Sequence, residues 1–181
     1  PPMPRSIPTL IMPANTTLQG LGDLTVIRFH GNNSLRDWSG IKPASNTAIT
    51  RIRFITDFSV GTTIEQTHVI RMDGPVRDVS LTHLSFYHPA NGAKSGDCIQ
   101  LVGYPPLIDG SNDKRIWNVN IGHNRFERCD RSGVAIHSGL HGTFTGGYWS
   151  SRIHDNVFVV ISDQAIDGEG SGDTDGLEID H

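Results

Sequence analysis

Two carboxylates near the end of the chain, Asp167 and Glu169, stand two positions apart in the segment DQAIDGEG. On an extended strand, residues two apart lie on the same face, with Cα atoms roughly 6.6 Å apart. Inverting glycoside hydrolysis uses two carboxyl groups ~6.5 to 9.5 Å apart, whereas the retaining reaction uses a pair ~5 to 5.5 Å apart. Asp167 and Glu169 are therefore candidate catalytic residues for inverting hydrolysis, unless the flanking glycines interrupt the strand.

The segment that carries this pair is one of four similar segments. Each has an isoleucine in an equivalent place: HVIRMDG, GDCIQLVG, SGVAIHSG and DQAIDGEG align Ile70, Ile99, Ile136 and Ile166. The intervals between these isoleucines are 29, 37 and 30 residues. Intervals of this size are typical of repeat proteins in which each unit stacks on its neighbour. The isoleucines are thus predicted to form a column in the core.

The residue after each isoleucine would then form an outward row, with neighbours about 4.8 Å apart. That row is Arg71, Gln100, His137 and Asp167. Arg71 and Gln100 are candidate substrate-binding residues for an extended, hydroxyl-rich polymer. His137 would lie one strand from Asp167, so it is a candidate base that removes the proton beside a uronate carboxylate, with Arg71 or a cation neutralising the enolate. The alternative is an ordinary solvated sheet face.

A second set of segments supports the same architecture. In three of them an aliphatic residue is followed five positions later by phenylalanine: Leu81/Phe86, Ile121/Phe126 and Ile153/Phe158. Apolar and polar residues alternate with a period of two, which is typical of short strands, and no window shows an apolar stripe at helical spacing. The prediction is an all-β parallel solenoid of about five coils, in one domain over residues 1–181, with loops near 32–48, 104–114 and 140–150.

The first part of the chain resembles a known superfamily. An apolar Leu10/Ile11 pair, a turn at Pro13, the Gly20/Gly22 turn and a Thr-Val-Ile strand resemble the opening coil of the pectate-lyase-like proteins. The resemblance implies a single-stranded right-handed parallel β-helix that acts on polysaccharides. The superfamily includes lyases, hydrolases, epimerases and phage tailspikes, and its lyases often use Lys or Arg with Ca²⁺. No motif of this chain matches those catalytic residues.

The segment DGEGSGDTDGLEID carries six carboxylates in 14 residues. Its spacing partly matches an EF-hand loop, but neither flank is helical, so an EF-hand is excluded. A Ca²⁺ site that uses Asp173, Asp175 and Glu178 is a candidate, and turns in which the carboxylates cap backbone N–H groups are the alternative.

Aromatic residues and histidines offer further candidates. Tyr104, Tyr148 and Trp149 lie in predicted loops, where they would stack on sugar rings or cover the flank of the solenoid. Three histidines fall near the same place in successive repeats: His83, His123 and His154. A metal ladder is conceivable, but no close zinc-ligand spacing supports it, so these histidines are predicted to be exposed or hydrogen-bonded to asparagine.

Cys98 and Cys129 lie in different repeats. We predict two buried free thiols, because their spacing does not indicate a pair; a bridge between coils is the alternative.

The composition restricts the partners. A net charge of -4 and the absence of a Lys/Arg cluster argue against nucleic acid, and no apolar run is long enough to insert in a membrane. The sequence thus predicts an extracellular or virion-associated protein that binds and cleaves polysaccharide by hydrolysis or β-elimination. The alternative is a non-catalytic structural or adhesive segment, such as part of a tailspike.

Because the last repeat stops within a strand pattern, the segment is also expected to be a piece of a longer solenoid, or to be covered by other chains, as in a homotrimer.

Overall fold

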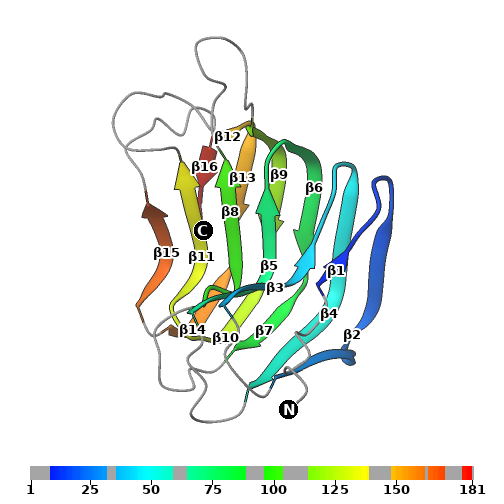
Figure 1. Cartoon of the computed structure of the whole chain (residues 1–181), viewed down its shortest axis with the longest axis vertical. Helices are drawn as coiled ribbons and strands as arrows, with labels where there is room; N and C mark the ends of the chain where they lie inside the picture. Colours follow the sequence, from blue (N-terminus) through cyan, green and yellow to red (C-terminus); the bar gives the residue numbers. More distant parts are fainter. Residues whose placement is uncertain are drawn as a thin grey trace, which may run out of the picture.

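The computed structural model describes residues 9–31, 36–58, 65–88, 96–103, 114–138, 148–161, 163–169 and 177–180. All the regular structure in these residues is β, which confirms the predicted all-β class. The strands form two sheets, and their pairing is parallel throughout the described part (Figure 1). Among these residues, no helix is long and apolar enough to cross a membrane.

The first sheet has six strands. Their order is β1 (Leu10–Ile11), β3 (Arg36–Lys42), β5 (Glu65–Asp73), β8 (Ile99–Gly103), β11 (Ser132–Ser138) and β15 (Gln164–Glu169). Figure 1 shows β5, β8, β11 and β15 side by side in chain order. Each strand therefore pairs with its equivalent in the next repeat.

The second sheet has ten strands in two branches. One branch holds β6 (Val76–Thr82), β9 (Ile116–Gly122), β13 (Ser151–His154) and β16 (Leu177–Ile179), and the other holds β7 (Ser85–His88), β10 (Arg125–Cys129) and β14 (Val157–Ile161). The long strand β4 (Thr47–Phe58) pairs with both β6 and β7 and so joins the branches. Two further strands lie off this path, β2 (Thr17–Gly31) on β4 and β12 (Tyr148–Trp149) on β9.

The predicted isoleucine column exists, but one member is different. Ile41, Ile70, Ile99, Val134 and Ile166 align across the six-stranded sheet. Ile136, which was predicted to be in this column, pairs instead with Leu101 and Gly168. Val134 and Ile136 are both apolar and stand two apart on one strand, so a pattern with a period of two cannot distinguish the two registers.

The equivalent phenylalanines of the second set of segments stack in the core, as expected for aligned repeats. Phe54, Phe86 and Phe126 are completely buried, and their rings stack with centroids 5.6 and 5.0 Å apart. Phe158 continues the stack at 4.7 Å from Phe126. Burying a phenylalanine side chain contributes about 1.5 to 3 kcal/mol, so this column is a principal stabilising feature of the core.

The two branches of the ten-stranded sheet meet at a turn that repeats in every unit. The first residue of each turn has a left-handed backbone conformation, with φ between 51° and 58°. These residues are Arg51, His83, His123 and Asp155. Asn124 and Asn156 follow in two of these turns. Asn124 accepts a hydrogen bond from Leu84 N (2.9 Å) and donates one to Leu81 O (2.9 Å), and Asn156 bonds Asn124 N and Ile121 O in the same way. These side chains satisfy backbone groups that the turn removes from the strand ladders.

Two predictions of local structure are wrong. Residues 36–42, predicted to be in a loop, form β3, because Trp38 is buried edge-on against Phe29 with ring centroids 5.3 Å apart. Cys98 and Cys129, predicted to be free thiols, form a disulfide with Cα atoms 5.7 Å apart. Their separation of 31 residues is close to the length of one repeat, so stacking brings the two cysteines together.

Candidate functional site

The six-stranded sheet places the predicted row in line except for one residue. The prediction that this row is an exposed face is wrong, because Gln100 and Asp167 are only 3% and 6% exposed. Arg71 pairs with Gln100, and Ala135 pairs with both Gln100 and Asp167. His137 was predicted to stand between Gln100 and Asp167, but this register is wrong by two positions. His137 pairs with Val102 and Glu169. Since residues two apart on a strand share a face, His137 stays on the face of the row but lies one residue pair farther along.

The side chain of His137 nevertheless returns to the row. Its Nε2 lies 3.1 Å from the Gln100 amide nitrogen. An amide N–H donates to Nε2 only when that nitrogen carries no proton. Burial also lowers the pKa of His137, although the Asp97 carboxylate acts in the opposite direction. His137 is therefore a half-buried, neutral imidazole near pH 7.

Asp167 is almost buried and ion-paired. Its Oδ2 accepts a hydrogen bond from Arg131 Nη2 at 2.8 Å. The same arginine places Nε 4.0 Å from Asp97 Oδ1. Arg131 thus lies between two buried carboxylates, one from β15 and one just before β8. Asp167 Oδ2 is thus already occupied by Arg131, and the carboxylate is directed toward this cation.

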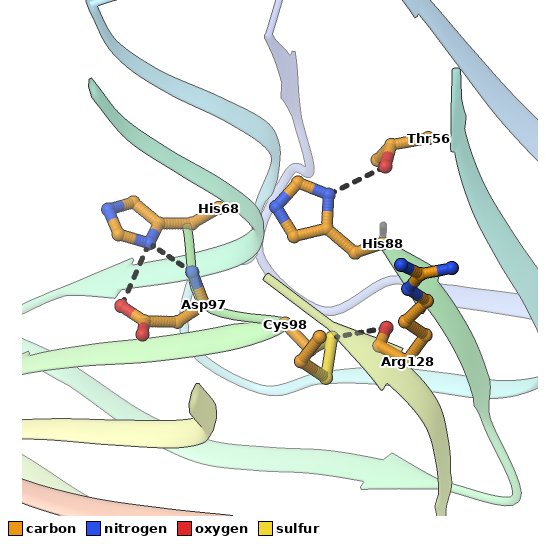
Figure 2. Close-up of a disulfide and its surroundings, with 7 residues drawn as sticks. Thr56, His68, His88, Asp97, Cys98 and Arg128 are labelled. Atoms are coloured by element: carbon orange, nitrogen blue, oxygen red, sulfur yellow. Dashed lines mark hydrogen bonds and ion pairs between the residues drawn. A yellow bond between two sulfur atoms is a disulfide. The ribbon is translucent and has the colours of Figure 1, made fainter. Parts of the chain in front are cut away.

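Asp97 is the most deeply buried carboxylate of this group. Burial alone would raise its pKa, but the hydrogen bond and charge of His68, together with the Arg131 guanidinium, hold the pKa below its usual value. His68 Nδ1 lies 3.2 Å from Asp97 Oδ2, and both side chains are inaccessible to solvent (Figure 2). The backbone N–H of Asp97 also points at this Nδ1, from 3.4 Å, so the His68 ring faces both the amide and the carboxylate of Asp97.

Sequence reasoning missed Asp97, His68 and Arg131. A signal for the first two existed, because residues 68 and 97 are 29 positions apart, the same interval as Ile70 and Ile99. Arg131 follows a strand end in an irregular connection, and no periodic pattern identifies it.

A second buried histidine lies close to this group but does not belong to the row. His88 Nδ1 is 2.6 Å from Thr56 Oγ1, and burial lowers the pKa of His88 to about 4, helped by the charge of His68 (Figure 2). His88 is consequently neutral across the physiological range, and its surroundings indicate a structural role.

Arg71 lies in the row but is held by a carboxylate. Its Nε donates to Asp73 Oδ1 at 2.8 Å, and Lys42 Nζ donates to Asp73 Oδ2 at 2.7 Å. Burial would raise the pKa of Asp73, but these two cations lower it overall. Two cations around one carboxylate leave this end of the row with a positive charge.

Of the other predicted site residues, the structure places the backbone of Glu169 beside the row and Glu178 away from it. Glu169 lies on β15 opposite His137, and the strand continues through Gly168, so this glycine does not interrupt it. Glu178 lies on β16 in the other sheet, exposed, with Oε2 3.5 Å from Arg152 Nε. The side chains of Glu169, Tyr148 and Trp149, and the residues Tyr104, Asp173 and Asp175, lie outside the described part of the structure.

An aromatic residue that sequence reasoning passed over lines a pocket on the ten-stranded sheet. Trp117, Arg77 and Asp78 line an open pocket of about 300 Å³. The Arg115 guanidinium lies 4.8 Å from the centre of the Trp117 ring. A half-exposed indole flanked by hydrogen-bonding groups suits stacking on a sugar ring.

Comparisons with protein-family models, curated proteins and solved structures find no significant match to this chain. Its function is therefore argued from its own fold and residues.

Proposed function

We propose that the chain is a right-handed parallel β-helix of the pectate-lyase-like kind, forming one domain, that binds an extended acidic polysaccharide along the row from Arg71 to Asp167 and cleaves it by β-elimination. The parallel pairing of successive repeats supports the fold. The observation that carries the function is a neutral His137 bonded to Gln100, within a cluster that also holds buried Asp–Arg pairs.

In this proposal, His137 removes the proton beside the uronate carboxylate. The electron pair of that C–H bond forms a double bond and expels the glycosidic oxygen of the next sugar, which takes up a proton from solvent. Gln100 Oε1 has no hydrogen-bond partner among the described residues. The Gln100 N–H now occupies the Nε2 lone pair, so this amide must turn away before Nε2 can take the substrate proton. The turn would then present Oε1 to the newly formed Nε2–H and stabilise the protonated ring. The positive charge around Arg71 would attract the polymer's carboxylates.

Elimination is preferred to hydrolysis because of Asp167. Hydrolysis would need the Asp167 carboxyl to contact the substrate, but this carboxyl is buried and occupied by Arg131. Elimination needs a base and a cation, which His137 and Arg71 supply. A Ca²⁺ site at Asp173, Asp175 and Glu178 stays a separate proposal, because Glu178 lies on β16 in the other sheet. Asp167 would then position Arg131 and the neighbouring side chains.

The second candidate is a non-catalytic structural or adhesive segment. It is favoured by the Trp117 pocket, which suits sugar binding without any catalytic group, and by the ion pairs that occupy Asp167 and Arg71. Both candidates share an extracellular or virion location, which the Cys98–Cys129 disulfide supports because such bonds persist in oxidising compartments. A homotrimer or a longer chain would cover the ends of the stack in either case.

The two candidates are separated by incubating the protein with acidic and neutral polysaccharides while following reducing ends and the absorbance of unsaturated uronates. Elimination produces both signals, and hydrolysis only the first. His137→Ala should lower the rate ~100-fold or more, since a general base contributes about 10² to 10⁴. His30→Ala, an exposed histidine on β2, is the matched control. Binding without any cleavage would establish the adhesive candidate instead, and full activity of His137→Ala would refute the proposed base.

A further inference from the structure

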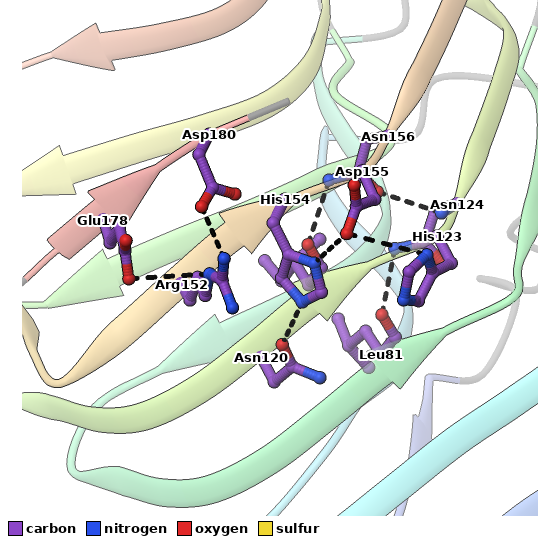
Figure 3. Close-up of polar contacts among 11 residues, drawn as sticks. Leu81, Asn120, His123, Asn124, Arg152, His154, Asp155, Asn156, Glu178 and Asp180 are labelled. Atoms are coloured by element: carbon purple, nitrogen blue, oxygen red, sulfur yellow. Dashed lines mark hydrogen bonds and ion pairs between the residues drawn. The ribbon is translucent and has the colours of Figure 1, made fainter.

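A different set of side chains, on the ten-stranded sheet, forms a compact group of metal-ligating atoms. His123, His154 and Asp155 each offer one nitrogen or oxygen, and these atoms all lie within 4.8 Å of one another. The turn that joins the two branches creates this group, because His123 and Asp155 hold the same left-handed position in successive repeats and His154 directly precedes Asp155 (Figure 3). The stack therefore brings together residues 31 and 32 positions apart.

We propose that His123, His154 and Asp155 bind a divalent transition metal of the zinc class. Two imidazoles and one carboxylate suit Zn²⁺ and its neighbours, whereas Ca²⁺ and Mg²⁺ prefer oxygen ligands throughout. Three protein ligands leave at least one coordination position for water or another ligand.

The distances between the ligand atoms fit such an ion. His154 Nδ1 lies 2.7 Å and His123 Nδ1 lies 3.9 Å from Asp155 Oδ2. Ligands at about 2.0 to 2.1 Å from a tetrahedral zinc are separated by roughly 3.3 Å, which lies between these two values. His123 and Asp155 are about half exposed, so their side chains have room to move into that geometry.

The hydrogen bond made by one ring nitrogen of His154 determines that the other nitrogen would bind the metal. His154 Nε2 lies 2.7 Å from Asn120 Oδ1, an acceptor, so Nε2 carries the proton. In the neutral ring this leaves the lone pair on Nδ1, which faces the Asp155 carboxylate. Two electron-rich atoms at this distance need a cation between them, either a proton or a metal ion. An imidazole held in this way by a carbonyl oxygen is the usual arrangement of a metal-binding histidine.

The surrounding charge permits a divalent cation. Arg152 is the nearest arginine that acts on Asp155, and it is paired with Glu178 at 3.5 Å and with Asp180. Figure 3 shows Arg152 directed toward these two carboxylates. Its charge is thus balanced, and the carboxylate of Asp155 remains available.

The test uses the whole chain, freed of any affinity tag and treated with chelator. We expect one Zn²⁺ per chain by calorimetry, a rise in the melting temperature with Zn²⁺, and visible absorption bands of a low-symmetry site with Co²⁺. His123→Ala and Asp155→Asn, at exposed positions, should each weaken Zn²⁺ binding at least ~10-fold; asparagine also tolerates the left-handed backbone of residue 155. Asn120→Ala should weaken it by about 10-fold or more through the ring of His154.

His30→Ala is the control, because His30 also faces a carboxylate, Asp57, at 3.4 Å but lies in a separate pair. This variant should bind Zn²⁺ like the parent chain. Absence of binding by the parent chain would overturn the proposal. Equal binding by folded His123→Ala and Asp155→Asn variants would overturn it as well. Neither readout depends on polysaccharide cleavage, so this proposal and the proposed function fail independently.

Discussion

At the scale of single residues, the buried charges are organised by one arginine. Arg131 contacts Asp167 at 2.8 Å and lies 4.0 Å from Asp97, and all three side chains are largely shielded from solvent. A charge in such surroundings is tolerated only when a partner of opposite sign is present. Arg131 is therefore the residue on which two carboxylates of the candidate site depend.

Replacing Arg131 by leucine should destabilise the protein by about 3 to 5 kcal/mol, because it leaves Asp167 buried without its cation and removes one of the partners of Asp97. Urea unfolding measures the change in the free energy of unfolding. Arg152→Leu is the matched control: Arg152 also pairs with an aspartate, but at an exposed site, so its loss should have a much smaller effect. Equal effects of the two substitutions would contradict the role given to Arg131.

Among the candidate residues, Arg71, Gln100 and Asp167 could be aligned from sequence because each follows an apolar residue of the same periodic column. His137 could not, since both Val134 and Ile136 satisfy that period. The partners of these residues were not predictable either. The contact between Arg131 and Asp167 joins residues 36 positions apart through a side chain that follows no repeat.

At the scale of elements, the stack is held by hydrogen-bond ladders, by the phenylalanine column and by one covalent link. The disulfide joins the residue just before β8 to the end of β10, which belong to successive repeats. Cys98 and Cys129 are both completely buried, so the link lies within the core and not on its surface. It restrains the connection between the two sheets.

The Cys98→Ala/Cys129→Ala variant should lose about 3 to 4 kcal/mol of stability, since closing a loop of some 30 residues restricts the unfolded chain by this amount. Denaturant unfolding of the two proteins measures the difference. In addition, mass spectrometry after alkylation should detect no free thiol until the protein is unfolded and reduced. Rapid alkylation of the native protein would contradict the disulfide.

At the scale of the whole molecule, buried neutral histidines make stability depend on pH. Burial lowers the pKa of His88 to about 4 and also lowers that of His137. When the pH is below the usual histidine pKa of about 6.5, a histidine in the unfolded chain binds a proton, whereas the buried histidine stays neutral. Their contribution to stability is thus present above about pH 6.5 and is lost as the pH falls below it, and for His88 the loss extends to about pH 4.

His88 alone should account for a loss on the order of 3 kcal/mol between pH 6.5 and 4. Below pH 4 the loss should continue as protons bind carboxylates with lowered pKa, Asp97 and Asp73. Thermal unfolding across pH 4 to 8 should show a plateau above pH 6.5 and a decline below it. His88→Asn should flatten the decline, whereas His30→Asn should not. An unchanged slope in His88→Asn would show that another group is responsible.

The sequence by itself determined that the chain is all β, that repeats of about 30 residues stack, and that Phe86, Phe126 and Phe158 form a column. These features follow from alternation along each strand and from the interval between repeats, which are both properties of a linear pattern. Only the tertiary structure decided the register of β11, the strand over residues 36–42, the disulfide, and the clusters around Arg131 and Asp155. Those depend on loop lengths and on distances between neighbouring repeats. Two residues meet there because they occupy the same register position in successive repeats. An alternation of two, or an interval of about thirty residues, does not specify that register to within one residue pair.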